Sequence, residues 1–367
     1  MLIGLPKEIK NHEYRVGMIP NHVRALTQRG HEVLVQKGAG LGSGFGDDLY
    51  VEAGAQMIES AAEVWTRSDM IVKVKEPVAS EYDLMQEGQL IYTYFHLAAD
   101  PELTQVLLDK KISAVAYETI ETTDGRLPLL VPMSQVAGRM ATQVGAQCLQ
   151  KEKGGKGVLL GGVPGVRRGK VVILGGGVVG TQAATIAVGM GADVRILDID
   201  AKRLEELDFL FEGRVQTLYS DPYTIEAQVK DADLVIGAVL IAGAKAPTLI
   251  SRELIGQMQP GSVVVDVAVD QGGCIETCHP TTHDNPTFVV DDVVHYCVAN
   301  MPGAVSQTST LALNSTTRPY LLALVDHGVE AACKADPALM LGLNTYQGRC
   351  THKAVAESLG YKYEPLV

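Results

Sequence analysis

The sequence predicts an α/β fold with two doubly wound parallel-sheet domains. Two series of short apolar runs occur along the chain, and helix-like stretches separate the runs within each series. Strands that alternate with helices at this spacing form parallel sheets covered by helices on both faces. The length of 367 residues fits this organisation, because a domain holds ~150 residues. The composition, 46% hydrophobic and 20% charged, excludes a disordered or fibrous chain.

The first series of strands begins at the N-terminus. Its predicted strands are Leu2–Leu5, Glu32–Val35, Met70–Val74, Leu90–Tyr94 and Ile112–Tyr117. Helix-like segments, such as Asn21–Gln28 and Ala61–Arg67, lie between them. We expect these strands to form the sheet of one domain.

The second series starts near Lys170. Its predicted strands are Val171–Leu174, Val194–Leu197, Val215–Leu218, Leu234–Val239 and Val263–Val267. The gaps between them suit repeated βα units. We expect these strands to form the sheet of a second domain.

The segments outside the two series suggest how the domains connect. Val131–Gln150 reads as one long helix with Ser134 as its N-cap, and the Gly-rich loop Lys153–Val166 follows it. After about residue 305 the pattern is helical to the end, and we expect this tail to pack back on the first domain. The predicted domains are therefore residues 1–128 with 306–367, and residues 129–305.

The charge and the cysteine content limit the function classes. Lys and Arg number 31 and Asp and Glu number 43, which gives a formal charge of −12 and disfavours binding to nucleic acid. Six cysteines without a disulfide framework suit reduced thiols in the cytosol. The longest apolar run, Leu234–Ala244, has 11 residues, whereas a membrane span needs ~20. We therefore expect a cytoplasmic protein.

A dinucleotide-binding fingerprint opens the second series. Gly175, Gly177 and Gly180 fill the pattern G-x-G-x-x-G between a predicted strand and a predicted helix. Asp198 ends the next predicted strand, 18 residues after the third glycine, close to the ~20 that the motif requires. The helix N-terminus would face the phosphates, and Asp198 would accept hydrogen bonds from the ribose. This carboxylate would repel a 2′-phosphate, so the sequence predicts a Rossmann domain that binds NAD.

Two other Gly-rich stretches do not support nucleotide binding. Gly38–Asp48 lacks the third glycine and the following helix, strand and acid, so we expect a loop there that could line a cleft. Gly165–Lys170 is one residue short of a Walker A loop, and Val171 follows it in place of Ser or Thr.

Four side chains near predicted strand ends could carry chemistry. Arg15 and Lys75 could hold a carboxylate, although a surface cation is the simpler interpretation of each. His96 follows a predicted strand and suits proton transfer near neutral pH. Asp270 ends the fifth strand of the second series, whereas we expect Asp266 to pair within the fold.

One short segment offers an alternative metal site. Cys274, Cys278, His279 and His283 lie within ten residues and are soft ligands that zinc accepts. Their spacing departs from that of zinc knuckles. We therefore interpret the segment as a loop and predict no metal.

An ordered set of motifs gives the chain a family resemblance. The segments are KEIKNHEYRVGMIP (Lys7–Pro20), VKVKEP, TYFHLA, VPMSQVAG, GGVPGV, LGGGVVG, VAVDQGG and HYCVANMPGAV, in this order over nearly the whole chain. With these segments the chain resembles the alanine dehydrogenases, in the family that also includes the NAD(P) transhydrogenase alpha subunit. The resemblance implies a cytosolic homohexamer that converts L-alanine to pyruvate and ammonia with NAD.

The resemblance also implies roles for particular residues. Arg15 and Lys75 would hold the substrate, and His96 and Asp270 would act as acid–base residues. The implied NAD contacts beside the glycines are Ser134, Val178, Val179, Asp198, Arg203, Ser220, Val239, Leu240, Val267, Ala268, Val269, Asp270, Val298, Ala299, Asn300 and Met301. His279 stands where some members carry an Arg near the cofactor. Some members carry a magnesium site, which Glu118 and His327 could match, but we predict none.

Three alternatives remain open from the sequence. They are an NAD-binding transhydrogenase-like subunit, a non-catalytic NAD-binding sensor, and a related dehydrogenase of the lysine or saccharopine type. His96 and the Asp270 segment favour alanine dehydrogenase over the first. Release of pyruvate from alanine would separate it from the second.

Overall fold

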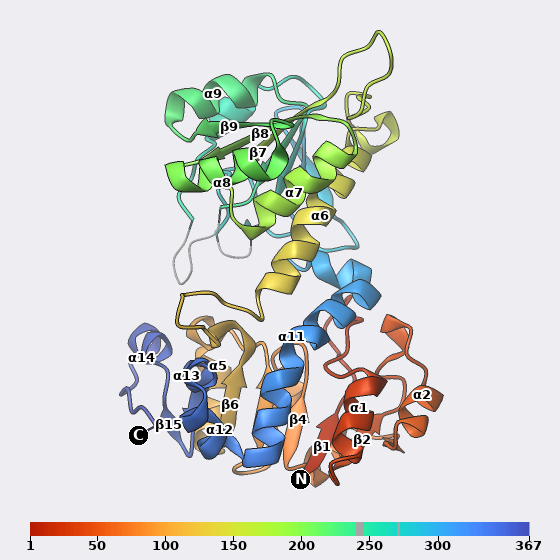
Figure 1. The fold of residues 1–367 in the computed structure, drawn as a ribbon, viewed down its shortest axis with the longest axis vertical. Helices are drawn as coiled ribbons and strands as arrows, with labels where there is room; N and C mark the ends of the chain where they lie inside the picture. The colour runs from red at the N-terminus through yellow and green to blue at the C-terminus, as the bar shows by residue number, and fades with distance from the viewer. Residues whose placement is uncertain (240–245, 270–271, 367) are drawn as a thin grey trace. The chain divides into compact units, whose positions relative to one another are not determined.

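The computed structural model describes residues 1–239, 246–269 and 272–366 (Figure 1). The chain divides into two compact units, of which unit 1 comprises Met1–Met133 and Gly303–Val367 and unit 2 comprises Ser134–Pro302. Leu240 and Asp270, both predicted site residues, lie outside the described residues. Within the described ranges, no helix combines the length and the apolar character that crossing a membrane requires.

Unit 1 contains an eight-stranded sheet in the order β15-β14-β6-β5-β4-β1-β2-β3. Its strands are β1 (Leu2–Leu5), β2 (Glu32–Gln36), β3 (Gln56–Ile58), β4 (Met70–Val72), β5 (Leu90–Thr93), β6 (Ser113–Ala116), β14 (Leu343–Tyr346) and β15 (Arg349–Cys350). The first six strands are parallel and follow the doubly wound order 3-2-1-4-5-6. Chain connections therefore leave β1 and β4, which are neighbours, in opposite directions.

Helices cover both faces of this sheet. They are α1 (Pro20–Thr27), α2 (Asp47–Glu52), α3 (Ala61–Arg67), α4 (Ala79–Tyr82), α5 (Pro101–Asp109), α11 (Ser306–His327), α12 (Val329–Ala335), α13 (Pro337–Gly342) and α14 (Lys353–Leu359). Ile91 of β5 packs in a core with Trp65 of α3 and Leu107 of α5. The next residue, Tyr92, points to the other face, where its hydroxyl donates to the carbonyl of Thr317 in α11 at 3.1 Å. Successive side chains of β5 thus point to opposite faces of the sheet, and each face packs against its own layer of helices.

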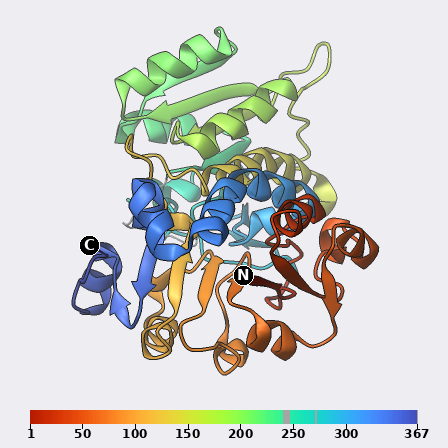
Figure 2. The same ribbon diagram turned by 60° about the horizontal axis from the view of Figure 1, so that its bottom comes forward.

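The C-terminal segment differs from its predicted, wholly helical form. The helix expected there is α11, but Leu343–Tyr346 and Arg349–Cys350 are strands. Strand β14 pairs antiparallel with β6 and extends the sheet of unit 1. Figure 2 shows this segment, in blue, at the end of the sheet where β6 lies.

Unit 2 contains a seven-stranded sheet in the order β12-β13-β11-β10-β7-β8-β9. Its strands are β7 (Lys170–Leu174), β8 (Asp193–Asp198), β9 (Val215–Tyr219), β10 (Leu234–Gly237), β11 (Val263–Asp266), β12 (Thr287–Val290) and β13 (Val293–Tyr296). Its helices are α6 (Val131–Cys148), whose residues up to Met133 belong to unit 1, α7 (Val178–Gly189), α8 (Ala201–Phe211), α9 (Pro222–Lys230) and α10 (Arg252–Ile255).

The parallel strands of unit 2 have the strand order of a Rossmann domain. Counted from β7, the order from β9 to β13 is 3-2-1-4-5-6. Among the described strands of this sheet, β12 alone is antiparallel, and it joins β13 through Asp291 and Asp292, which both have positive φ as a type I′ turn requires. The predicted α/β class, with two doubly wound sheets and a Rossmann domain second, is confirmed.

One predicted helix boundary is wrong. Helix α6 begins at Val131, so Ser134 lies inside its first turn and is not its N-cap. Pro132 stands in that first turn, where proline costs no hydrogen bond.

Candidate functional site

The candidate substrate residues follow neighbouring strands of unit 1 at the carboxyl edge of its sheet. Arg15 follows β1, Lys75 follows β4 and His96 follows β5, and these strands are adjacent in the order β1-β4-β5. The first two lie at the point where the strand order reverses, which is where doubly wound sheets bind ligands. The Thr93 hydroxyl donates to the Lys75 carbonyl at 3.0 Å, which ties the segment after β4 to the end of β5.

Arg15 is almost fully buried, with 3% of its surface exposed. Its Nε donates to Oε1 of Glu13 at 2.7 Å, and its Nη2 donates to Oε2 at 2.5 Å. Its Nη1 points to the sulfur of Met133 at 3.0 Å. Burial lowers the pKa of Arg15, but the hydrogen bonds and the charge of Glu13 outweigh burial and raise this pKa overall. Arg15 is therefore a fixed cation, not a mobile surface side chain.

Lys75 lies close enough to Arg15 to feel its charge. Burial lowers the pKa of Lys75, and the positive charge of Arg15 lowers it further. The carboxylates of Glu76 and Glu13 act on this pKa in the opposite direction and offset part of the repulsion between the two cations. An anionic ligand would relieve the repulsion that remains.

Glu8 holds the backbone around Lys75, a role that no local sequence pattern predicts. Its Oε1 accepts the amides of Val74 at 2.6 Å and Lys75 at 3.3 Å. Its Oε2 pairs with buried Lys73 at 3.4 Å, which also binds Glu81 at 2.8 Å. This buried cluster fixes the strand end that presents Lys75.

His96 adopts an unusual backbone conformation for a residue with a side chain. Its φ is 55° and its ψ is 37°, in the left-handed region. The imidazole is exposed and lies parallel to the ring of Tyr94, with centroids 6.1 Å apart and an interplanar angle of 4°. The Tyr94 hydroxyl donates to the Leu129 carbonyl at 2.5 Å, which anchors the stacked ring.

The three glycines of the fingerprint meet the requirements of a dinucleotide turn. Gly175 has φ of 97°, and a Cβ there would lie 2.8 Å from the carbonyl oxygen of Ala238. A Cβ on Gly180 would overlap the Gly175 carbonyl, so this glycine allows helix α7 to pack on β7. A Cβ on Gly177 would meet nothing within 4 Å. That open space lies at the N-terminus of α7, where unpaired amides can receive a pyrophosphate.

Asp198 and Arg203 brace the glycine turn. Asp198 accepts the Gly176 amide at 2.6 Å and the Asp200 amide at 2.9 Å. Arg203 donates from Nε to the Gly176 carbonyl at 2.8 Å and from Nη2 to the Thr181 hydroxyl at 2.8 Å. Asp198 and Arg203, the two residues expected beside the adenosine ribose, therefore both contact the glycine turn.

The other predicted cofactor residues follow the carboxyl ends of parallel strands. Ser220 follows β9, Val239 follows β10, Val267 to Val269 follow β11, and Val298 to Met301 follow β13, while Val178 and Val179 begin α7. Ser134 lies in α6 one turn before Gly138, whose Cβ would overlap the Val179 carbonyl. Helix α6 thus packs closely on the start of α7.

Asp266 pairs within the fold, as expected. It is fully buried and accepts the amides of Ala268 at 3.1 Å and Cys274 at 2.9 Å.

The two histidines of the alternative metal site contact other groups. The ring of His279 stacks on Phe288 with centroids 4.0 Å apart, and His283 bonds to the Asn300 carbonyl at 2.9 Å. Across the described ranges, no three His, Cys, Asp or Glu side chains group as a metal site.

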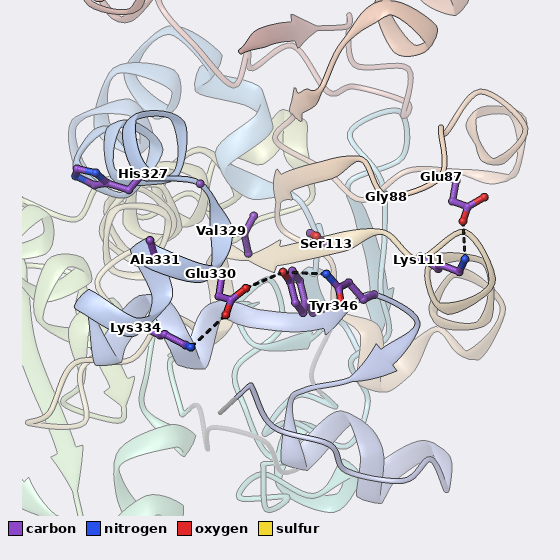
Figure 3. A pocket seen from close by; sticks show the side chains of 12 residues that line it. Glu87, Gly88, Lys111, Ser113, His327, Val329, Glu330, Ala331, Lys334 and Tyr346 are labelled. Atoms are coloured by element: carbon purple, nitrogen blue, oxygen red, sulfur yellow. Dashed lines mark hydrogen bonds and ion pairs between the residues drawn. The ribbon is translucent and has the colours of Figure 1, made fainter.

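Of two cavities in unit 1, one is lined by Arg15 and the other lies at the opposite edge of the sheet. One of about 310 Å³ is lined by Glu13, Arg15 and the loop Gly38–Gly42, so this Gly-rich loop does line a cavity. The other, of about 1000 Å³, lies at the amino ends of β5 and β6 beside Gly88 and Ser113 (Figure 3). His327 lines the second cavity, whereas Glu118 follows the opposite end of β6.

Known proteins resemble this chain over its whole length. The family model "Alanine dehydrogenase/PNT, N-terminal domain" matches residues 4–137, and "Alanine dehydrogenase/PNT, C-terminal domain" matches residues 141–353. An alanine dehydrogenase of Staphylococcus haemolyticus is 58% identical over 99% of this chain and 97% of its own length. One of Methanococcus maripaludis is 56% identical over 100% of this chain and 98% of its own length.

Solved structures agree with these relatives. An L-alanine dehydrogenase matches with a TM-score of 0.96 and 55% identity, over 98% of this chain and 99% of that one. A transhydrogenase from Sinorhizobium meliloti matches with a TM-score of 0.84 and 25% identity, over 95% of this chain and 100% of that one. The resemblance found in the sequence is confirmed: this chain belongs to the alanine dehydrogenase/PNT family.

Proposed function

We propose that the protein catalyses the reversible, NAD-dependent oxidative deamination of L-alanine to pyruvate and ammonia. The observation that carries this proposal is the pair of neighbouring cations, Arg15 and Lys75, at the strand-order reversal of unit 1. Relatives named alanine dehydrogenase, at 56–58% identity over nearly the whole chain, support the same reaction. We further propose that unit 1 binds the substrate and that unit 2 binds the cofactor.

The two cations would hold the substrate by its carboxylate and, after oxidation, by its carbonyl region. Arg15 uses Nε and Nη2 to bind Glu13, which fixes the plane of its guanidinium. Lys75 is a compact cation whose lowered pKa eases its entry into a partly dry site. A fixed fork and a point charge together orient a small amino acid.

His96 and Asp270 would move the protons of the reaction. The substrate amine must lose a proton before hydride leaves the α-carbon. Water must then add to the resulting imine, and ammonia must leave from the carbinolamine. These steps need a base and then an acid, and the exposed His96 imidazole at the strand edge is suited to exchange both protons.

Residues of unit 2 fit an NAD molecule. The open space at Gly177 and the N-terminus of α7 would receive the pyrophosphate, and Asp198 would bind the adenosine ribose. When bound, NAD supplies the hydride acceptor. Asp198 would repel a 2′-phosphate, which favours NAD over NADP.

We also propose that the protein acts as a cytoplasmic homohexamer. The family resemblance supports this assembly. Exposed apolar side chains on the segment after α6 support self-association, since Leu159 is 66%, Val163 54% and Val166 63% exposed. Light scattering of the purified protein would test the assembly, and a monomer at micromolar concentration would contradict it.

Assays that replace L-alanine by other amino acids, and NAD by NADP, would test the reaction directly. We expect NADH to form with L-alanine and NAD, and to form poorly with NADP, serine or glycine. The His96→Ala variant should lose most of its kcat while it still binds NADH. An unchanged kcat would exclude His96 from the proton transfers.

A further inference from the structure

The backbone of His96 is held from both sides. Its carbonyl accepts the Ala99 amide at 3.0 Å. Its own amide donates to Oε1 of Glu118 at 2.6 Å. A non-glycine residue in the left-handed region persists only where its surroundings impose that conformation. The two bonds therefore identify the groups that impose it.

Glu118 binds two successive amides. Besides the His96 amide, its carboxylate accepts the Phe95 amide at 3.1 Å to Oε1 and 3.2 Å to Oε2. These amides come directly after β5, beyond the last pair of the ladder with β6, Thr93 with Ala116. Glu118 thus replaces the strand partner that the turning backbone no longer has.

The placement of Glu118 follows from the sheet. It lies in the short 3-10 helix Tyr117–Thr119, which starts where β6 ends. Because β5 and β6 are parallel neighbours, their carboxyl ends meet at one edge. The carboxylate reaches the turn after β5 from there, while the imidazole stays exposed beside Tyr94.

We propose that Glu118 is a positioning residue for the acid–base step, which holds the His96 turn left-handed and so aims the imidazole at the substrate. This proposal rests on the proposed function, since it gives His96 a proton-transfer role. Glu118 acts through backbone amides and does not itself exchange protons with the substrate. Hence the acceptor oxygens of its side chain should matter more than its charge.

Three variants separate this role from other roles. Glu118→Ala removes the acceptor, Glu118→Gln keeps one acceptor oxygen without the charge, and Glu121→Ala removes an exposed carboxylate three residues away. The measurements are kcat and KM for L-alanine, NADH affinity by fluorescence titration, and the rate at which diethyl pyrocarbonate modifies His96, followed by mass spectrometry.

The expected pattern is specific. E118A should lower kcat by about tenfold or more, because a misplaced catalytic group can cost ~10²-fold. Its KM and NADH affinity should stay within about threefold of the wild type, and the His96 modification rate should change. E118Q should recover most of kcat, since one oxygen can still accept both amides, and E121A should match the wild type.

Two results would overturn the proposal. One is a kcat of E118A within about twofold of the wild type. The other is an E118Q variant as slow as E118A, which would make the charge and not the acceptor decisive. If E118A does not fold, E118L fills the volume without an acceptor and is judged by the same criteria. Full activity of His96→Ala would instead exclude His96 from the proton transfers, and a wild-type protein that forms no NADH from L-alanine and NAD would refute the proposed function, whatever the Glu118 variants do.

Discussion

Glu13 binds Arg15 through two parallel hydrogen bonds, Nε to Oε1 at 2.7 Å and Nη2 to Oε2 at 2.5 Å. One residue separates Glu13 from Arg15 in the sequence, and both side chains are buried. Glu13 compensates the charge of Arg15 and selects the edge of the guanidinium that faces the protein. If Arg15 binds the substrate as proposed, this cation is oriented before the substrate arrives, which would lower the entropic cost of binding.

Glu13→Gln should weaken alanine binding and the fold together. Breaking a buried ion pair leaves a buried charge uncompensated, at a cost of about 3 kcal/mol in the free energy of unfolding. KM for L-alanine should rise, since Arg15 loses its orientation, while NADH affinity should stay the same. Denaturant unfolding and steady-state kinetics measure both effects. Glu63→Gln, which breaks the exposed pair with Arg67, is the control and should change neither; an unaltered KM in E13Q would argue against this role of Glu13.

The fingerprint glycines should respond differently to a methyl group. Gly177→Ala places the methyl in open space, so the fold should persist while NADH affinity falls by about tenfold, or about 1.4 kcal/mol. Gly180→Ala overlaps the Gly175 carbonyl and should cost about 1–3 kcal/mol of stability. Calorimetry and NADH titration separate the two effects.

Gly189→Ala is the matched control for these variants. It lies in the same helix, and its Cβ would also meet nothing within 4 Å. It should bind NADH normally and gain up to about 1 kcal/mol, because alanine favours helix more than glycine does. Normal NADH affinity in Gly177→Ala would contradict the phosphate-binding role of that turn.

Asp198→Ala should relax the preference for NAD. Removing the carboxylate removes the repulsion of a 2′-phosphate, and Arg203 remains at the glycine turn. The ratio of kcat/KM for NADP to that for NAD should rise by about tenfold or more. Asp200→Ala should keep the wild-type ratio and lose only the helix cap on the Lys202 amide, worth about 1 kcal/mol. If both variants keep the ratio, Asp198 does not select the cofactor.

His22 should make the protein sensitive to acid. Burial, and then the charge of Arg318, lowers the pKa of His22 from 6.5 to about 4. As the pH falls below 6.5, His22 therefore becomes protonated in the unfolded chain, whereas in the folded chain it stays neutral until the pH reaches about 4. Stability should fall over this window by about 3 kcal/mol and level off below it.

A neutral replacement tests this expectation. In His22→Gln, the loss of stability between pH 6.5 and pH 4 should be smaller than in the wild type by about 3 kcal/mol. The variant should nevertheless be less stable than the wild type at pH 7. Urea unfolding at several pH values provides the comparison. An identical pH dependence in both proteins would mean that other groups cause the acid sensitivity.

Local pattern was enough for the strands that position the site. Leu2–Leu5, Met70–Val74 and Leu90–Tyr94 are short apolar runs between helical segments, and they appear as β1, β4 and β5. The glycine fingerprint was also readable, because its constraints lie within a few residues of each other. Both successes depend on short-range signals.

Long-range contacts explain what local pattern missed. Strand β14 has only four residues after a helix, and it is a strand because β6 offers it a partner. Glu8 and Glu118 act on backbone amides 66 and 22 or more residues away. Nothing near them in the sequence marks such partners, so only the folded sheet reveals these roles.

The most direct measurement follows NADH absorbance when the purified protein meets L-alanine and NAD, with pyruvate and ammonia assayed in the same sample. We expect NADH, pyruvate and ammonia to appear in equal amounts, and the reverse reaction to consume NADH when pyruvate and ammonia are supplied. Tight binding of NADH without any turnover of L-alanine would contradict the dehydrogenase function.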